Sequence, residues 1–357
     1  MVIDINMHVL PDLLFKDEAV LESFLRAAPR AYGEFAFVRD LPGSPGKKQI
    51  QVEMPRGYEN LNFSDYSIDH EARIKIMDQA GLDIAILRTP CWQEWLSLEM
   101  CKFVNDGVYE VVQEHPDRLR AVAIVPPWGD KGCLEEANRC INKLGFVGIE
   151  MAAHYGTLYL DDEAFRPYFR HLNEMGVPIV VHHTPLPVDY HSIYKYTNVR
   201  RSIGRCIDQL TAVSLEMFGG LFDECPNLKL IHSMMGGGVF AFTNQIAPRK
   251  STFKEEVQRF DQKTADVRKY LKDNLYFGIT TPTAWSKPQL ECAIKELGAE
   301  QILYGSSYPV RIDWVLSGVE YVRGLDISEA EKELIFCGNA QRLFKIPVAE
   351  TAGLTHK

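Results

Sequence analysis

The sequence predicts a (β/α)₈ barrel, because eight short apolar runs alternate with helical segments along one chain of 357 residues. Each apolar run has the length of a strand, and a longer stretch with helical character follows it. A chain of this length buries a large core, and no GxGxxG follows the first strand, which disfavours a doubly wound dinucleotide-binding sheet. We therefore expect a single domain over residues 1–357.

Composition excludes several classes of function. Hydrophobic residues make up 46% and charged residues 24% of the chain, as in ordinary globular proteins. The net charge of −9 disfavours nucleic-acid binding, which needs a basic surface. No apolar run is long enough to span a bilayer, so we expect no membrane association. The eight cysteines include no CxxC pair, which favours reduced thiols in a cytoplasmic protein.

The first strand carries polar side chains at alternate positions. Residues 1–11 contain a short apolar run that is interrupted by Asp4, Asn6 and His8. Because side chains two apart in a strand point to the same face, we expect these three to point together toward something polar.

Residues 12–63 lose clear periodicity. This segment contains several prolines and the turn-like sequence LPGSPG at 41–46. Its length exceeds that of an ordinary loop, so we expect a small inserted subdomain or lid at about residues 12–63.

The remaining chain alternates strands and helices. Predicted strands cover residues 84–87, 119–126, 147–151, 178–182, 228–232, 275–278 and 302–304. Predicted helices cover residues 67–79, 98–114, 131–144, 165–175, 202–222, 239–270, 288–297 and 329–344. Three helices are predicted to stop at Gly81, Gly145 and Gly176, since glycine is favoured just after a helix.

Histidines follow three of the predicted strands. His8, His182 and His232 come at the ends of the first, fifth and sixth strands. A barrel carries its chemistry at the carboxyl ends of its strands, and imidazole is a common ligand of transition metals. Each histidine alone is more simply a hydrogen-bonded structural residue, but the coincidence of three indicates a bound ion.

Other strand ends supply candidate residues for a substrate pocket, namely Arg88, Trp92, Trp95 and His154. Arg88 is suited to clamp a substrate carboxylate, or to pair with Asp83 or Glu150. The two tryptophans either line an apolar pocket or cap the barrel.

Six motifs resemble one known family. They are residues 4–8 (DINMH), 115–126 (HPDRLRAVAIVP), 177–182 (VPIVVH), 226–230 (PNLKL) before a triple glycine, 302–309 (ILYGSSYP) and 338–344 (GNAQRLF). In this order they resemble the amidohydrolase-related metal-dependent proteins typified by aminocarboxymuconate semialdehyde decarboxylase. The resemblance implies an amidohydrolase-type barrel that decarboxylates, hydrates or hydrolyses small organic acids.

The resemblance also implies an ion site, from which this chain departs. In the family two first-strand histidines, a fifth-strand histidine and an eighth-strand aspartate hold one ion, usually zinc. His8 and His182 match two of these ligands, whereas Asn6 and Ser307 stand at the other two. Met234 stands near the position of a sixth-strand histidine that acts on substrate or water.

The departures weaken the expected site. Ser307 supplies no negative charge, and Asn6 offers a neutral amide oxygen that suits a hard cation more than zinc. His232 lies two residues before Met234, on the same face of a regular strand, and is the remaining catalytic candidate. Glu150 restores an anionic ligand or is a satisfied structural carboxylate, and Asp313 is a further replacement.

We therefore expect at most one divalent ion, zinc first, held by His8 and His182 with His232 and Glu150 as further ligands.

Three functions are consistent with this degenerate site. The first is a non-catalytic or structural partner of a homologous catalytic subunit, because one branch of the family resembles a two-subunit 2-aminoisobutyrate hydroxylase that acts on a small amino acid. The alternative is an active mononuclear-metal decarboxylase or hydrolase with an altered ligand set, as a homodimer. The third is a metal-free small-acid binding protein. The loss of ligands favours the first, with weak or no activity of the chain alone.

Overall fold

The barrel is closed by eight parallel strands. The computed structural model describes residues 1–27, 35–64, 69–90, 97–246 and 264–347. The strands of the main sheet are β1 (Ile3–His8), β5 (Ile84–Arg88), β6 (Leu119–Ile124), β7 (Gly148–Ala152), β10 (Ile179–His182), β11 (Leu230–His232), β12 (Leu275–Gly278) and β13 (Ile302–Leu303), in that order. The backbone N–H of Ile5 donates to the carbonyl oxygen of Tyr304 at 3.0 Å, which joins the last strand region to the first. The predicted (β/α)₈ barrel is confirmed.

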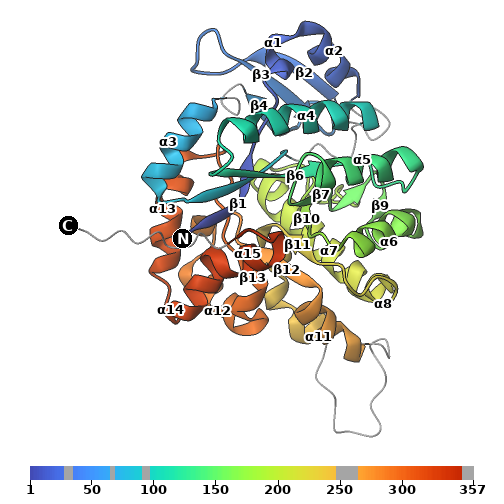
Figure 1. The fold of residues 1–357 in the computed structure, drawn as a ribbon, viewed down its shortest axis with the longest axis vertical. Coiled ribbons are helices and arrows are strands. Elements are labelled where there is room, and N and C mark those ends of the chain that lie inside the picture. The colour runs from blue at the N-terminus through green and yellow to red at the C-terminus, as the bar shows by residue number, and fades with distance from the viewer. Residues whose placement is uncertain (28–34, 65–68, 91–96, 247–263, 348–357) are drawn as a thin grey trace, which may run out of the picture.

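Helices surround this sheet (Figure 1). They are α3 (His70–Ala80), α4 (Leu98–Glu114), α5 (Lys131–Asn142), α6 (Arg166–Met175), α7 (Gly204–Phe218), α8 (Leu221–Glu224), α11 (Thr264–Asp273), α12 (Lys287–Leu297), α13 (Ile312–Arg323), α14 (Glu329–Glu333) and α15 (Asn339–Phe344). Asp69, Ser97 and Asp130 cap α3, α4 and α5, each with a side-chain oxygen that accepts a first-turn N–H. None of the helices in the described ranges is long and apolar enough to cross a membrane.

The barrel interior is filled by side chains from alternate strand positions. Its apolar cluster contains Ile3, Ile5, Ile86, Val122, Val180, Ile231 and Leu303. Residues of α15 belong to the same cluster, so this helix covers the amino-terminal end of the barrel. The carboxyl-terminal end therefore remains as the mouth, where chemistry is expected in this fold.

A bulge in β1 changes the direction of its polar side chains. Asp4 pairs with Ala85 and His8 with Arg88, but the register shifts between them. Ile3 and Ile5 face the interior, so Asp4 faces the opposite side, where its carboxylate accepts the N–H of Ser306 at 3.1 Å. The prediction that Asp4, Asn6 and His8 point the same way was wrong for Asp4, because an extra residue in a strand reverses the faces beyond it.

The segment between β1 and α3 has secondary structure of its own. It contains α1 (Leu13–Lys16), α2 (Glu18–Ala27) and an antiparallel sheet of β2 (Phe35–Asp40), β3 (Lys48–Glu53) and β4 (Glu59–Ser64). In Figure 1 these elements lie together above α4. Phe24, Ile50 and Val52 are fully buried and join the main apolar core, so the segment packs against the barrel.

The two longest predicted helices are shorter than expected. The stretch 202–222 is divided at Gly219 and Gly220 into α7 and α8, and Gly220 has the left-handed φ of +75°. The stretch 239–270 contains α10 (Thr243–Ile246) and α11, and residues 247–263 lie outside the described part of the chain. Gly81 and Gly176 end α3 and α6 in the left-handed conformation, as predicted.

The triple glycine after β11 allows close contact with α7. A Cβ on Gly237 would lie 1.9 Å from the carbonyl oxygen of Cys206 and 2.7 Å from the backbone nitrogen of Leu210, and its φ is +68°. We expect Gly237→Ala to lower the free energy of unfolding by at least about 2 kcal/mol, because it combines overpacking against rigid backbone with a disfavoured φ. Urea denaturation of this variant, with Gly220→Ala as a control that has no atom within 4 Å of its new Cβ, measures the effect of the close contact.

Candidate active site

Two histidines face each other at the mouth of the barrel. His8 ends β1 and His182 ends β10, and their ring centroids are 5.4 Å apart. The Nδ1 of His182 lies 2.7 Å from the carbonyl oxygen of His183. Because a carbonyl only accepts, this Nδ1 donates the hydrogen bond and fixes the ring orientation. The Nε2 of His8 is buried and has no hydrogen-bond partner among the described residues.

Both imidazoles are held neutral. Burial, together with the positive charges of Arg88, Arg73 and Arg205, lowers the pKa of His8 to about 3. Burial also lowers the pKa of His182 well below its usual value, with additional repulsion from His183 and Arg88. At neutral pH the mouth therefore contains uncharged rings in a positive electrostatic field.

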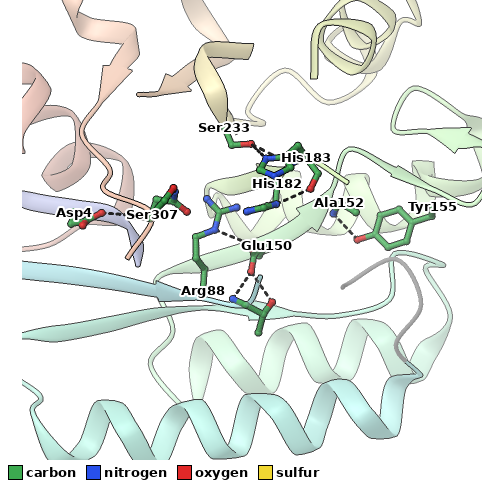
Figure 2. A network of polar contacts seen from close by, with 11 residues as sticks. Asp4, Arg88, Glu150, Ala152, Tyr155, His182, His183, Ser233 and Ser307 are labelled. Carbon is green, nitrogen blue, oxygen red and sulfur yellow. Dashed lines mark hydrogen bonds and ion pairs between the residues drawn. The ribbon is translucent and has the colours of Figure 1, made fainter. Parts of the chain in front are cut away.

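Arg88 brings a buried positive charge beside these rings (Figure 2). It stands directly across from His8 at the end of β5 and is 2% exposed. Its Nε donates to Glu150 Oε1 at 2.7 Å, and the other carboxylate oxygen accepts from the N–H and hydroxyl of Thr89 at 2.9 and 3.0 Å. Of the interpretations that the sequence left open, the structure supports pairing of Arg88 with Glu150. Both oxygens of Glu150 are engaged in this way, so it is a satisfied structural carboxylate.

Asn6 and Ser307 bind each other at the seam between β1 and β13. The Nδ2 of Asn6 donates to Ser307 Oγ at 2.6 Å, and Ser307 Oγ donates to the carbonyl oxygen of Thr280 at 2.9 Å. A hydroxyl has one proton, so Ser307 accepts from Asn6, which fixes the amide orientation. The Oδ1 of Asn6 is buried without a hydrogen-bond partner among the described residues.

His232 does not join the other two histidines. Its Nε2 lies 2.8 Å from Glu216 Oε2 and its Nδ1 2.9 Å from Gln209 Oε1, both on α7. Ile231 faces the barrel interior, so the next side chain faces outward to the surrounding helix. The structure thus disagrees with His232 as an ion ligand or as a substitute for the catalytic histidine, because its position on the strand has the wrong parity.

The other predicted residues are dispersed. His154 is buried beyond β7, where its Nε2 contacts Thr184 Oγ1 at 2.8 Å and the carbonyl oxygen of Leu186 at 2.9 Å. Met234 follows β11 with a φ of +51°, and its N–H donates to Thr280. Asp313 is exposed in the first turn of α13 beside Arg311. Trp92 and Trp95 lie outside the described residues.

Three buried residues near the mouth were not predicted as site residues. His183 stacks on His182 with centroids 4.1 Å apart, and its backbone N–H donates to Ser233 Oγ at 3.2 Å. Asp208 of α7 accepts the N–H of Thr184 at 2.8 Å and thereby anchors the segment after His182. The adjacent histidines 182 and 183 are visible in the sequence. The contact between Asp208 and Thr184 could not be predicted, because it depends on how α7 packs against the barrel.

One large cavity lies away from the predicted site residues. It has a volume of about 1090 Å³ and is lined by residues of α8, α11 and α12, by Lys229 just before β11 and by Arg342 of α15. It contains none of the predicted site residues. The carboxyl-terminal mouth, where buried polar atoms without partners gather, is the better candidate for chemistry.

The residues at the mouth do not fit the divalent ion that the resemblance implies. Two imidazoles bound to one tetrahedral ion have ring centroids roughly 5 Å apart. The spacing of His8 and His182 alone is therefore compatible with a shared ion. However, Asn6 and Ser307 are bonded to each other, and no set of three His, Cys, Asp or Glu side chains in the described ranges is arranged to hold a metal. The adjacent Arg88 guanidinium would repel a cation.

Comparison with known proteins identifies relatives along most of the chain. Residues 93–346 match the family described as amidohydrolase. A gamma-resorcylate decarboxylase from Rhizobium sp. (strain MTP-10005) is 31% identical over 291 residues, which cover 77% of this chain and 87% of the relative. A 2-amino-3-carboxymuconate-6-semialdehyde decarboxylase from Dictyostelium discoideum is 24% identical over 298 residues, which cover 76% and 75% of the two chains.

Solved structures share the fold. A dihydroxybenzoic acid decarboxylase from Polaromonas sp. JS666, with bound manganese and the inhibitor 2-nitroresorcinol, superposes with a TM-score of 0.66. It is 24% identical in sequence, and the match covers 96% of each chain. Homologous decarboxylases therefore bind a divalent metal.

Proposed function

Because the chain belongs to the amidohydrolase family, we propose that it is an enzyme that removes a carboxyl group from a small organic acid at the mouth of the barrel. The observation that carries this proposal is the facing pair His8 and His182 beside Arg88, a proton-transfer pair next to a charge that attracts acids. The two relatives compared above, each matched over about three quarters of the chain, are decarboxylases by name. These matches favour an enzyme over the partner subunit that the sequence analysis preferred, which has no support among them.

The reaction needs few groups. The bond between the carboxyl carbon and the adjacent carbon breaks, carbon dioxide leaves, and the adjacent carbon takes a proton. The Nδ1 of His182 keeps its proton in the hydrogen bond to the carbonyl of His183, so its neutral Nε2 is able to take the proton of the substrate's own carboxyl group and return it to the adjacent carbon. Arg88 binds an acidic group of the substrate, and burial excludes water.

Decarboxylation that depends on a divalent ion is less favoured than decarboxylation without one. Zinc on His8 and His182 was expected from the sequence, and the 5.4 Å spacing of the rings is compatible with it. Two neutral imidazoles without an anionic ligand hold a dication poorly against water. If an ion is bound, the amide oxygen of Asn6 suits manganese better than zinc.

We also propose that the segment after β1 closes over the mouth as a lid. Glu59 of β4 accepts Arg200 at its backbone oxygen, 2.8 Å away, and pairs with Arg201 through its carboxylate at 3.1 Å. Both arginines belong to a short helical turn, Val199–Ile203, that follows β10 and therefore lies beyond His182. These contacts join the inserted segment to a loop on the mouth side of the barrel. A cytoplasmic location and a homodimer stay predictions.

The direct test is release of carbon dioxide by the purified chain alone. We expect turnover with at least one acid from a panel of benzoate, salicylate and gamma-resorcylate, measured by isotope release from carboxyl-labelled acids. If carbon dioxide is released only when a second chain from the native cells is added, the chain is a partner of a catalytic subunit and not itself the decarboxylase. If acids bind without any turnover, the chain is a small-acid binding protein.

A further inference from the structure

We infer that Arg88 supplies the positive charge that relatives obtain from a divalent ion, so that this chain binds the acid group of its substrate without a metal. The inference deepens the proposed function and rests on it for the identity of the ligand as a small organic acid. Three features of the mouth carry it: the fixed guanidinium of Arg88 with its unpaired Nη2, the position of Arg88 beside the histidines, and the hydrogen bond between Asn6 and Ser307.

The guanidinium of Arg88 is fixed by its neighbours. Its Nε is engaged by Glu150, whose second oxygen is held by the backbone and the hydroxyl of Thr89. A guanidinium bound through Nε still has its terminal nitrogens for a second partner, and Nη2 has no acceptor among the described residues. Such a buried donor is costly when it is left unpaired, which indicates that a ligand pairs with it.

This donor points to the histidines. Figure 2 shows the Arg88 guanidinium next to the His182 ring. His8 lies directly across from Arg88 in the sheet. An acid group bound to Nη2 is therefore held beside both imidazoles, where proton transfer is proposed.

The hydrogen-bonding groups at the mouth suit an anion. Glu150 is paired with Arg88, and both of its oxygens already accept hydrogen bonds. No carboxylate among the described residues joins His8 and His182 as a ligand set. A dication there would find no carboxylate oxygen without a partner, whereas a carboxylate or phenolate would find the charged Nη2 donor of Arg88.

Asn6 and Ser307, at the seam between β1 and the segment after β13, replace two of the metal ligands that the family resemblance implies. In the family an aspartate and a histidine at these two positions are tied through the ion. Here Asn6 and Ser307 are tied by a direct hydrogen bond of 2.6 Å, which joins β1 to the segment after β13. Two positions that would bind a metal ion no longer do so, and the buried Arg88 supplies a positive charge close by. We therefore infer that the arginine, and not an ion, binds the acid group.

The test is calorimetric titration of benzoate, salicylate and gamma-resorcylate into the full chain, with and without excess EDTA. We expect the wild-type chain to bind at least one acid with the same affinity in both conditions. The double variant Arg88→Gln, Glu150→Gln removes both charges while keeping the shape of the pair. It is expected to bind about 10- to 100-fold more weakly, the range for loss of a charged hydrogen bond.

Matched variants separate binding from folding. Arg311→Gln removes an exposed arginine on α13 and should leave affinity unchanged. Arg88→Lys keeps the positive charge but lacks the planar set of donors of a guanidinium, so it should retain part of the affinity for the acid. Thermal melts and circular dichroism report whether each variant is folded.

Three outcomes overturn the inference: no acid binds the wild type, binding disappears in EDTA and returns with manganese, or the folded double variant binds as well as wild type. Metal-free binding without carbon dioxide release would leave the inference standing and overturn the proposed function.

Discussion

Replacing Asn6 with histidine and Ser307 with aspartate is expected to give the mouth a tightly bound divalent ion. The two changes place an imidazole and a carboxylate where the wild-type side chains form a hydrogen bond with each other, near the facing rings of His8 and His182. The affinity for manganese or zinc should rise more than about 100-fold, because even a group that only supports a ligand contributes about 10- to 100-fold. Elemental analysis after dialysis and calorimetric titration measure the gain.

The single variants provide the controls for this gain. Asn6→His alone and Ser307→Asp alone should each gain much less, since ligands of one ion are strongly coupled. A wild-type chain that already retains one ion after chelation would contradict this reading of Asn6 and Ser307.

The second large effect concerns the histidine pair. His8→Ala together with His182→Ala should lower kcat by about a hundred- to ten-thousand-fold, the range for loss of a positioned acid or base. Binding of the acid to Arg88 should change less, because the arginine is held by Glu150, which Thr89 holds in turn, rather than by the rings. Initial rates measure the loss of turnover, and calorimetric titration of the same preparation measures the change in acid binding.

The matched control is His115→Ala, a histidine at the end of α4 whose Nε2 lies 3.4 Å from an exposed glutamate. It should leave kcat unchanged. If the double histidine variant keeps wild-type turnover while folded, the mouth is not the site of proton transfer.

The architecture was predictable because its signals are local. Each barrel strand is a short apolar run, and helix ends are marked by Gly81, Gly176 and the capping Asp69 and Asp130. The bulge in β1 was not predictable from alternation, since it depends on pairing with β5. It reversed the face of Asp4 and left His8 at the mouth.

The site was predictable in part. His8 and His182 were placed together, and the pairing of Arg88 with Glu150 was one of the readings of the sequence. The prediction for His232 was wrong because Met234 lies beyond the end of β11 in a left-handed conformation, so the direction of Met234 does not indicate that of His232; the neighbouring Ile231 faces the barrel interior. The bond between Asn6 and Ser307 joins residues 301 apart and needed the closed barrel.

The most direct test of the account is turnover of the wild-type chain after exhaustive chelation, with the metal content of the same sample measured by elemental analysis. The account predicts carbon dioxide release from a small organic acid at an undiminished rate with far less than one ion per chain. Loss of activity on chelation, restored in proportion to added manganese or zinc, would contradict it.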